Sequence, residues 1–234
     1  MFEFIAFDAD DTLWHNENIY FATGEKFKSL LTPYCEPGVT DGKLYETELA
    51  NLQHFGYGIK SFTLSMIETA VQLTNGRIPA SDILTILNFA KEMRQHPVEL
   101  LPGVAEVVYQ LGHQYPLLII TKGDLFDQET KVAQSGIADH FRHVEVVSEK
   151  DPATYAALFA RLGIDPRTVL MVGNSLRSDV LPLVELGATA VYIPYHTTWE
   201  HETVTTATAQ QHSYHTLSSI VQLPDLVATL VGNQ

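Results

Sequence analysis

The sequence predicts an α/β fold, in which a doubly wound parallel sheet carries an all-helical segment inserted after its first strand. Two observations carry this prediction. From Leu101 onward, short apolar runs alternate with stretches of helical periodicity, which is typical of parallel strands joined by right-handed crossovers. Between Asn16 and His96, in contrast, apolar residues recur only at helical spacing, and no strand pattern is found.

The chain opens with one predicted strand. Phe2–Phe7 is a short apolar run that ends abruptly at Asp8, as a buried strand does. About four helices follow. Their apolar faces include Tyr45, Leu49 and Leu52, then Phe62, Met66, Ala70 and Leu73, then Ile83, Ile86, Leu87 and Ala90. The breakers between them are Pro33, Pro37 and Gly38, then Gly56 and Gly58, then Gly76 and Pro79.

The remaining elements alternate along the chain. Strands are predicted at 117–120, 144–147, 169–172 and 190–193. Helices are predicted at 104–111, 128–135, 152–162, 180–184 and 224–230. Asp151-Pro152 is a good helix start, with an acid at the N-cap and proline at the first position. The expected domains are therefore an α/β core at 1–13 and 98–234 and a helical domain at 14–97.

Composition excludes several classes of protein. Apolar residues make up 45% and charged residues 18% of the 234 residues, which argues against intrinsic disorder. The net charge is −14, so no basic field favours nucleic acid or an anionic membrane as a partner. Cys35 is the single cysteine and is expected to be inert. Without a membrane-span pattern or a signal-peptide pattern, the expected location is the cytoplasm.

Polar residues directly follow four of the predicted strands. In open parallel sheets, ligands bind outside the carboxyl ends of the strands, so we expect these groups to meet at one edge. They are Asp8-Ala9-Asp10-Asp11-Thr12, Thr121-Lys122-Gly123, Ser148-Glu149-Lys150, and Gly173-Asn174-Ser175 with Asp179 shortly beyond.

These groups together suit phosphoryl chemistry. The carboxylates of Asp8, Asp10 and Asp179 repel one another unless a cation joins them, and all-oxygen ligands favour a hard ion such as Mg²⁺. A hydroxyl, a close backbone approach and a positive charge come from Thr121, Gly123 and Lys150. One carboxylate can attack phosphorus to form an aspartyl-phosphate, and a second can protonate the leaving oxygen and later activate water.

The motifs resemble those of the haloacid dehalogenase superfamily, and the resemblance covers essentially the whole predicted core. The first motif reads Phe7-Asp8-Ala9-Asp10-Asp11-Thr12-Leu13. The later motifs are matched by Thr121, by Lys150 and by residues 173–180. The resemblance implies a Rossmann-like core, and it implies that 14–97 is the helical cap of a subgroup that acts on small phosphorylated metabolites.

The resemblance also implies a role for each matched residue. Asp8 would be the nucleophile and a metal ligand. Asp10 would be the general acid/base, with its backbone carbonyl also on the Mg²⁺ ion. The remaining residues of the implied site are Lys150 in the catalytic set, Asn174 and Asp179 as metal ligands, and Thr121, Lys122 and Gly123 as phosphate-binding residues. The implied reaction is Mg²⁺-dependent hydrolysis of a small phosphate monoester.

Three other functions stay open. A phosphomutase of the same superfamily would pass the phosphoryl group to a sugar, and release of inorganic phosphate separates the two. A 2-haloacid dehalogenase would need no metal, and such enzymes generally lack the second aspartate of the first motif, which is present here as Asp10. A receiver-like or phosphate-binding module would not turn over. Asn174, which stands where the family usually has aspartate, favours that last interpretation and puts the metal ligand set in question.

Several residues have a structural interpretation beside the functional one. Lys150 is preferred to Lys122 and Lys131 as the third-motif lysine. Trp14 and His15 either line a substrate pocket or pack at the junction of the domains. Asp179 could be only the N-cap of a helix that starts at Val180, and Asp11 receives no role. Solvated positions are preferred to a metal site for His196, His201, His212 and His215. The oligomeric state stays open.

Overall fold

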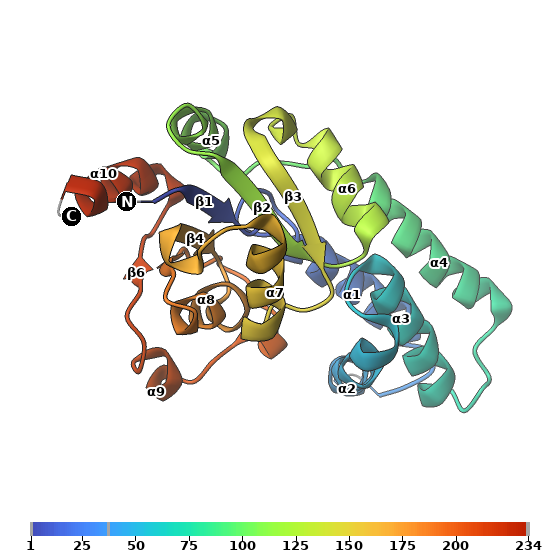
Figure 1. The fold of residues 1–234 in the computed structure, drawn as a ribbon. Helices are drawn as coiled ribbons and strands as arrows, with labels where there is room; N and C mark the ends of the chain where they lie inside the picture. The colour runs from blue at the N-terminus through green and yellow to red at the C-terminus, as the bar shows by residue number, and fades with distance from the viewer. Residues whose placement is uncertain (1, 37, 233–234) are drawn as a thin grey trace. The chain divides into compact units, whose positions relative to one another are not determined.

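The computed structural model describes residues 2–36 and 38–232, and within them six parallel strands form one sheet. The strands are β1 (Phe4–Phe7), β2 (Leu117–Lys122), β3 (Phe141–Val147), β4 (Val169–Gly173), β5 (Thr189–Tyr192) and β6 (His215–Thr216). Their order across the sheet is β3-β2-β1-β4-β5-β6 (Figure 1). The predicted fold class is confirmed.

Helices cover both faces of the sheet, because alternate side chains of each strand point to opposite sides. On β1, Ile5 and Phe7 belong to one apolar cluster and Ala6 belongs to the other. The first cluster includes residues of α5 (Val104–Gly112), α6 (Leu125–Gln134) and α10 (Leu223–Gly232), and the second includes residues of α7 (Pro152–Leu162) and α8 (Leu181–Glu185). The sheet is therefore doubly wound.

Short elements complete this part of the chain. They are α9 (Thr206–Ala209), 3-10 helices at Ala138–His140, Pro166–Thr168, Glu200–Glu202 and Ile220–Gln222, and a π-helical turn at Leu176–Val180. In the π-helical turn, the amide of Val180 donates to the carbonyl of Ser175, five residues back. Such turns are frequent at functional sites.

The helical insertion contains four helices among its described residues. They are α1 (Glu17–Leu31), α2 (Val39–Phe55), α3 (Ile59–Leu73) and α4 (Ala80–Gln95). Tyr45, Leu49 and Leu52 lie in α2, as their helical spacing predicts, but they are only half-buried. The buried residues of α2 are Thr40, Leu44, Thr47 and Asn51. Asn51 donates to the Ser65 hydroxyl of α3 at 3.1 Å, so a polar contact replaces the expected apolar one.

The chain forms two compact units. Among the described residues, one unit comprises 2–17, Val98–Lys122 and 130–232, and the other comprises 18–36, 38–97 and Gly123–Glu129. The helical unit thus begins four residues after the start predicted for the insertion. Of the predicted features, the breaker Pro37 and the terminal residues 1 and 233–234 of the core lie outside the described residues.

None of the helices in the described part of the chain combines the length and apolar character needed to cross a membrane.

Candidate active site

The Asp8 carboxylate is the centre of the candidate site. Its backbone amide donates to the Val172 carbonyl at 2.9 Å, which continues the pairing of β1 with β4 by one residue. The residue is 7% exposed. One side-chain oxygen, Oδ1, accepts from the Lys150 ammonium, and the other, Oδ2, accepts from the Thr12 hydroxyl at 3.0 Å.

Lys150 joins two buried carboxylates. Its ammonium donates to Asp8 and, at 2.7 Å, to Asp179 Oδ1. The lysine follows β3 and precedes α7, whose N-cap Asp151 accepts from the Thr154 amide at 2.7 Å. Burial and the neighbouring Asp179 raise the pKa of Asp8 to about 7, although Lys150 opposes the shift. Burial lowers the pKa of Lys150, but the two carboxylates outweigh it, so that pKa lies well above its usual value.

Asp179 is held inside the π-helical turn. It is 1% exposed, and its Oδ2 accepts from the Ser175 amide at 2.9 Å. The predicted alternative, in which Asp179 caps a helix starting at Val180, is wrong. Ser175 is the capping residue, because its hydroxyl accepts from the Ser178 amide. Asp179 therefore uses one oxygen for the loop and the other for Lys150.

Gly173, the last residue of β4, lacks a side chain, and the Asp179 carboxyl group occupies the place where a side chain would lie. A Cβ atom on Gly173 would lie 2.4 Å from the Asp179 carboxyl group. Gly173→Ala should therefore displace Asp179, cost about 1–3 kcal/mol in unfolding free energy and lower any activity at this site by about 10-fold or more. Gly24→Ala is the matched control, since nothing lies within 4 Å of Gly24 in α1. Urea unfolding of both variants checks the stability, and equal stability of the two would contradict the steric argument.

Three oxygen-bearing groups converge beside Asp8. The terminal atom of the Asn174 side chain lies 3.1 Å from Asp8 Oδ2, 3.3 Å from the Asp10 carbonyl and 3.2 Å from the Thr12 hydroxyl. With oxygen in this place the amide faces acceptors, which a cation among them would satisfy. With nitrogen there, the amide donates to the same atoms. Octahedral Mg²⁺ separates adjacent ligands by about 2.9 Å, so a carboxylate, a carbonyl and an amide oxygen at these spacings fit the ion.

The Asp179 carboxylate contacts Lys150 and the Ser175 amide, and its role as a metal ligand stays a prediction. Among the described residues, no three His, Cys, Asp or Glu side chains are placed to hold a metal ion together. The oxygens around Asn174 are not such a group of three acidic, histidine or cysteine side chains, because only Asp8 contributes a carboxylate side chain to them.

The Asp10 carboxylate has partners of its own. Trp14 donates its indole N–H to Oδ1 at 2.7 Å, and the Lys131 ammonium is 2.8 Å from each oxygen. Lys131 also donates to Asn16 Oδ1 at 3.0 Å. Trp14 is fully buried in the core cluster, and its packing at the junction of the domains stays a prediction.

Asp11, to which the sequence assigned no role, supports the start of α1. Its carboxylate accepts from the amides of Asn16 and Glu17 at 2.8–3.1 Å. The residue adopts a φ of +63°, a left-handed conformation that is uncommon outside glycine but that aspartate adopts more readily than most residues. Burial and the adjacent Asp10 raise the pKa of Asp11 to about 7.

Lys122 lies near the same strand ends but is bound to Glu202. The two side chains meet at 2.5 Å, and Lys122 also donates to the Ser178 hydroxyl at 2.9 Å. Glu202 accepts in addition from the hydroxyls of Ser175 and Ser178. Burial raises the pKa of Glu202, but Lys122 and the two hydroxyls outweigh it and lower that pKa to about 2. No sequence signal marks Glu202, which lies in a 3-10 helix far beyond the motifs.

The other predicted residues are placed as follows. Thr121 is 1% exposed near the carboxyl end of β2, next to the strand that ends before Asp8. Gly123 belongs to the helical unit, so its approach to a phosphate stays a prediction. His15 Nδ1 lies 2.6 Å from the Tyr195 hydroxyl. The His196 ring lies against that of Tyr195, with 4.1 Å between centroids.

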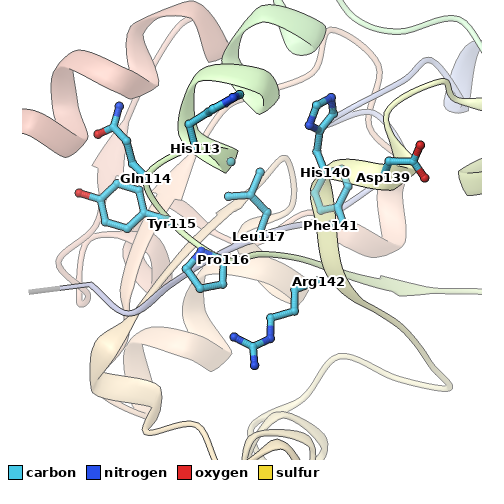
Figure 2. A pocket seen from close by; sticks show the side chains of 10 residues that line it. His113, Gln114, Tyr115, Pro116, Leu117, Asp139, His140, Phe141 and Arg142 are labelled. Atoms are coloured by element: carbon cyan, nitrogen blue, oxygen red, sulfur yellow. The ribbon is translucent and has the colours of Figure 1, made fainter.

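A pocket opens at the other end of the strands. Residues 112–117 and 139–142 line it, where β2 and β3 begin (Figure 2). Figure 2 labels His113, Asp139, His140 and Arg142 among its polar side chains. Because Asp8 and Lys150 lie at the carboxyl edge, this pocket is separate from the candidate site.

Comparison with known proteins decides the family. Residues 2–187 match the haloacid dehalogenase-like hydrolase family. The chain belongs to this family. A haloacid dehalogenase-like family hydrolase from Xanthomonas campestris is 39% identical, with a TM-score of 0.86 over 98% of this chain and 91% of that one.

One curated relative is similar over a shorter stretch. Glyceraldehyde 3-phosphate phosphatase of Pyrococcus abyssi is 31% identical over 101 residues, which is 41% of this chain. The chain thus spans 42% of the length of that relative.

More distant solved structures share only the fold. A HAD hydrolase from Bacillus subtilis bound to magnesium has a TM-score of 0.67 at 15% identity, over 97% of this chain and 99% of that one. The L-2-haloacid dehalogenase of Xanthobacter autotrophicus, with chloropropionic acid covalently bound, has a TM-score of 0.66 at 19% identity, over the same shares. The proteins that this chain resembles therefore include a phosphatase, by sequence, and a dehalogenase, by fold, and the residues of the site must separate the two activities.

Proposed function

We propose that the protein hydrolyses a small phosphate monoester through an aspartyl-phosphate on Asp8, with Mg²⁺ as cofactor and a small phosphorylated metabolite as substrate. The proposal rests on the observation that the two oxygens of the Asp8 carboxylate have different partners. One oxygen binds the buried ammonium of Lys150. The other accepts from the Thr12 hydroxyl and lies 3.1 Å from the terminal atom of the Asn174 side chain, which is also 3.3 Å from the Asp10 carbonyl. A nucleophile held in this way carries positive charge on one side and a hard-cation site on the other.

In the first step, Asp8 attacks the phosphorus atom and the bond from phosphorus to the leaving oxygen breaks. The leaving oxygen takes a proton from Asp10, so the alcohol departs neutral. In the second step, Asp10 accepts a proton from water while that water attacks the phosphorus, which releases inorganic phosphate and restores Asp8. Lys150 offsets charge on the phosphoryl oxygens during both steps.

The residues that would hold the metal are Asp8, the backbone carbonyl of Asp10 and Asn174. When bound, Mg²⁺ would neutralise the charge on the phosphoryl oxygens and on Asp8. Asp179 acts in this proposal by fixing Lys150 and the Ser175 amide. The magnesium-bound relative of the same fold supports the choice of ion.

Thr121 is proposed as a hydroxyl donor to the phosphate. Lys122 is a weaker candidate for that role, because its ammonium is bound to Glu202 and to the Ser178 hydroxyl. Its contacts support a structural part, in which it ties the Glu200–Glu202 turn to the loop that bears Asn174 and Asp179.

Dehalogenase activity is the second candidate, since dehalogenases share this fold. Asp10 argues against it, because release of a halide needs no proton and thus no acid in that position. Asp10 also gives the site the base that a receiver-like module does not need.

Removal of divalent metal tests the proposal. We expect release of inorganic phosphate from 4-nitrophenyl phosphate in Mg²⁺, a loss of at least about 100-fold in excess EDTA, and recovery on adding Mg²⁺. Asn174→Asp is the companion variant, because a charged ligand should lower the Mg²⁺ concentration required for half-maximal rate. Release of chloride from 2-chloropropionate without release of phosphate would favour the dehalogenase, and transfer of phosphate to a sugar would favour the mutase.

A further inference from the structure

The sequence offers three lysines as candidates for the third-motif lysine, and each of them has a different acidic partner in the structure. Lys150 binds Asp8, Lys122 binds Glu202, and Lys131 binds Asp10. The first contact belongs to the nucleophile and the second to a loop. The third involves Asp10, the proposed acid/base.

The contact fixes the Asp10 carboxylate from two sides. The Lys131 ammonium is 2.8 Å from both oxygens, and the Trp14 indole N–H is 2.7 Å from Oδ1. Trp14 is fully buried in the core, so its N–H has a fixed direction. Lys131 is anchored in turn by Asn16, which accepts at 3.0 Å. A carboxylate with these partners has lost most of its freedom to rotate.

We propose that Lys131 is a positioning residue, which holds the Asp10 carboxylate in the direction that its proton transfers require. The inference rests on the proposed function, since it assigns Lys131 to the acid/base of that reaction. A general acid must point at the leaving oxygen before the bond breaks, and small errors in direction are costly. The Lys131 and Asp10 side chains are 16% and 20% exposed, so the pair is partly solvated and its contribution to folding is modest.

The experiment is a double-mutant cycle that combines Lys131→Met with Asp10→Asn. The kcat of each variant is measured with an alkyl phosphate and with 4-nitrophenyl phosphate. Lys131→Met should lower kcat by about 10- to 100-fold with KM nearly unchanged. In an Asp10→Asn background the same change should have less than about a 2-fold effect, because the group that Lys131 positions is gone. Lys131→Arg should recover part of the loss. Equal effects in both backgrounds would overturn the proposal.

A second measurement needs no activity, and it separates this proposal from the proposed function. The sequence has two tryptophans, so the Trp14 indole resonance can be assigned by Trp14→Phe, with Trp199 as the internal reference. Lys131→Met should shift the Trp14 signal, because the Asp10 carboxylate, which accepts from both Lys131 and Trp14, then loses its contact with Lys131. Lys26→Met, which removes an exposed pair with Glu92, should leave both signals in place. An unchanged Trp14 signal in Lys131→Met would overturn the positioning role even in an active enzyme. A shifted signal in a protein that releases no phosphate would leave the contact supported and the proposed function rejected.

Discussion

Asp8→Asn is expected to abolish phosphate release, with a loss of about 10⁴- to 10⁶-fold in kcat. The amide oxygen is a poor nucleophile and cannot form the acyl-phosphate that the mechanism requires. The fold should persist, because asparagine has nearly the same shape and Lys150 keeps Asp179 as a partner. The measurement is steady-state release of inorganic phosphate, together with thermal unfolding of the same samples.

The matched control for this variant is Asp41→Asn. Asp41 is an exposed residue of α2 that pairs with Lys28, and its change should leave kcat within about 2-fold of the unmodified protein. If Asp8→Asn kept a kcat within about 10-fold of the unmodified protein, Asp8 could not be the nucleophile.

Lys150→Met should have the next largest effect, on both stability and activity. The Lys150 side chain is 1% exposed, and its ammonium lies between the carboxylates of Asp8 and Asp179. Without it, two buried acids face each other unpaired, which should cost about 3–5 kcal/mol in unfolding free energy. The activity should fall by about 10²- to 10³-fold, as when one electrostatic donor is removed from an active site.

Urea unfolding and kcat measured at saturating substrate check this prediction. Lys26→Met is the control, because its ion pair is exposed and contributes little. If Lys150→Met were as stable as that control, Lys150 could not be the buried partner of both acids. A normal kcat in a folded Lys150→Met would remove Lys150 from the mechanism.

The sequence predicted those parts of the fold that local patterns determine. The run before Asp8 and the runs at 117–120 and 169–172 are strands, because short continuous apolar runs fit a sheet that is buried on both faces. The two-residue strand β6 was missed, since His215 and Thr216 show no apolar run. The helix predicted at 128–135 begins earlier, at Leu125.

In the candidate site, too, the sequence predicted what neighbouring residues determine and missed what the packing of distant segments determines. The string from Asp8 to Thr12 could be read because its residues are neighbours in sequence and follow one strand. Contacts between distant segments could not be read. Lys122, Lys131 and Lys150 are chemically alike, and their partners depend on how β2, α6 and β3 are placed. Glu202 is an ordinary loop acid in the sequence and becomes part of the site's surroundings only through packing.

The aspartyl-phosphate on Asp8 can be detected directly, by locating the phosphoryl group on the protein. We would mix the protein with Mg²⁺ and 4-nitrophenyl phosphate, quench in acid within milliseconds and map the modified peptide by mass spectrometry. The proposed mechanism requires a phosphoryl group on Asp8 that forms and decays at rates consistent with kcat. Turnover at the normal rate with the label on another residue, or with no labelled residue in any quenched sample, would contradict it.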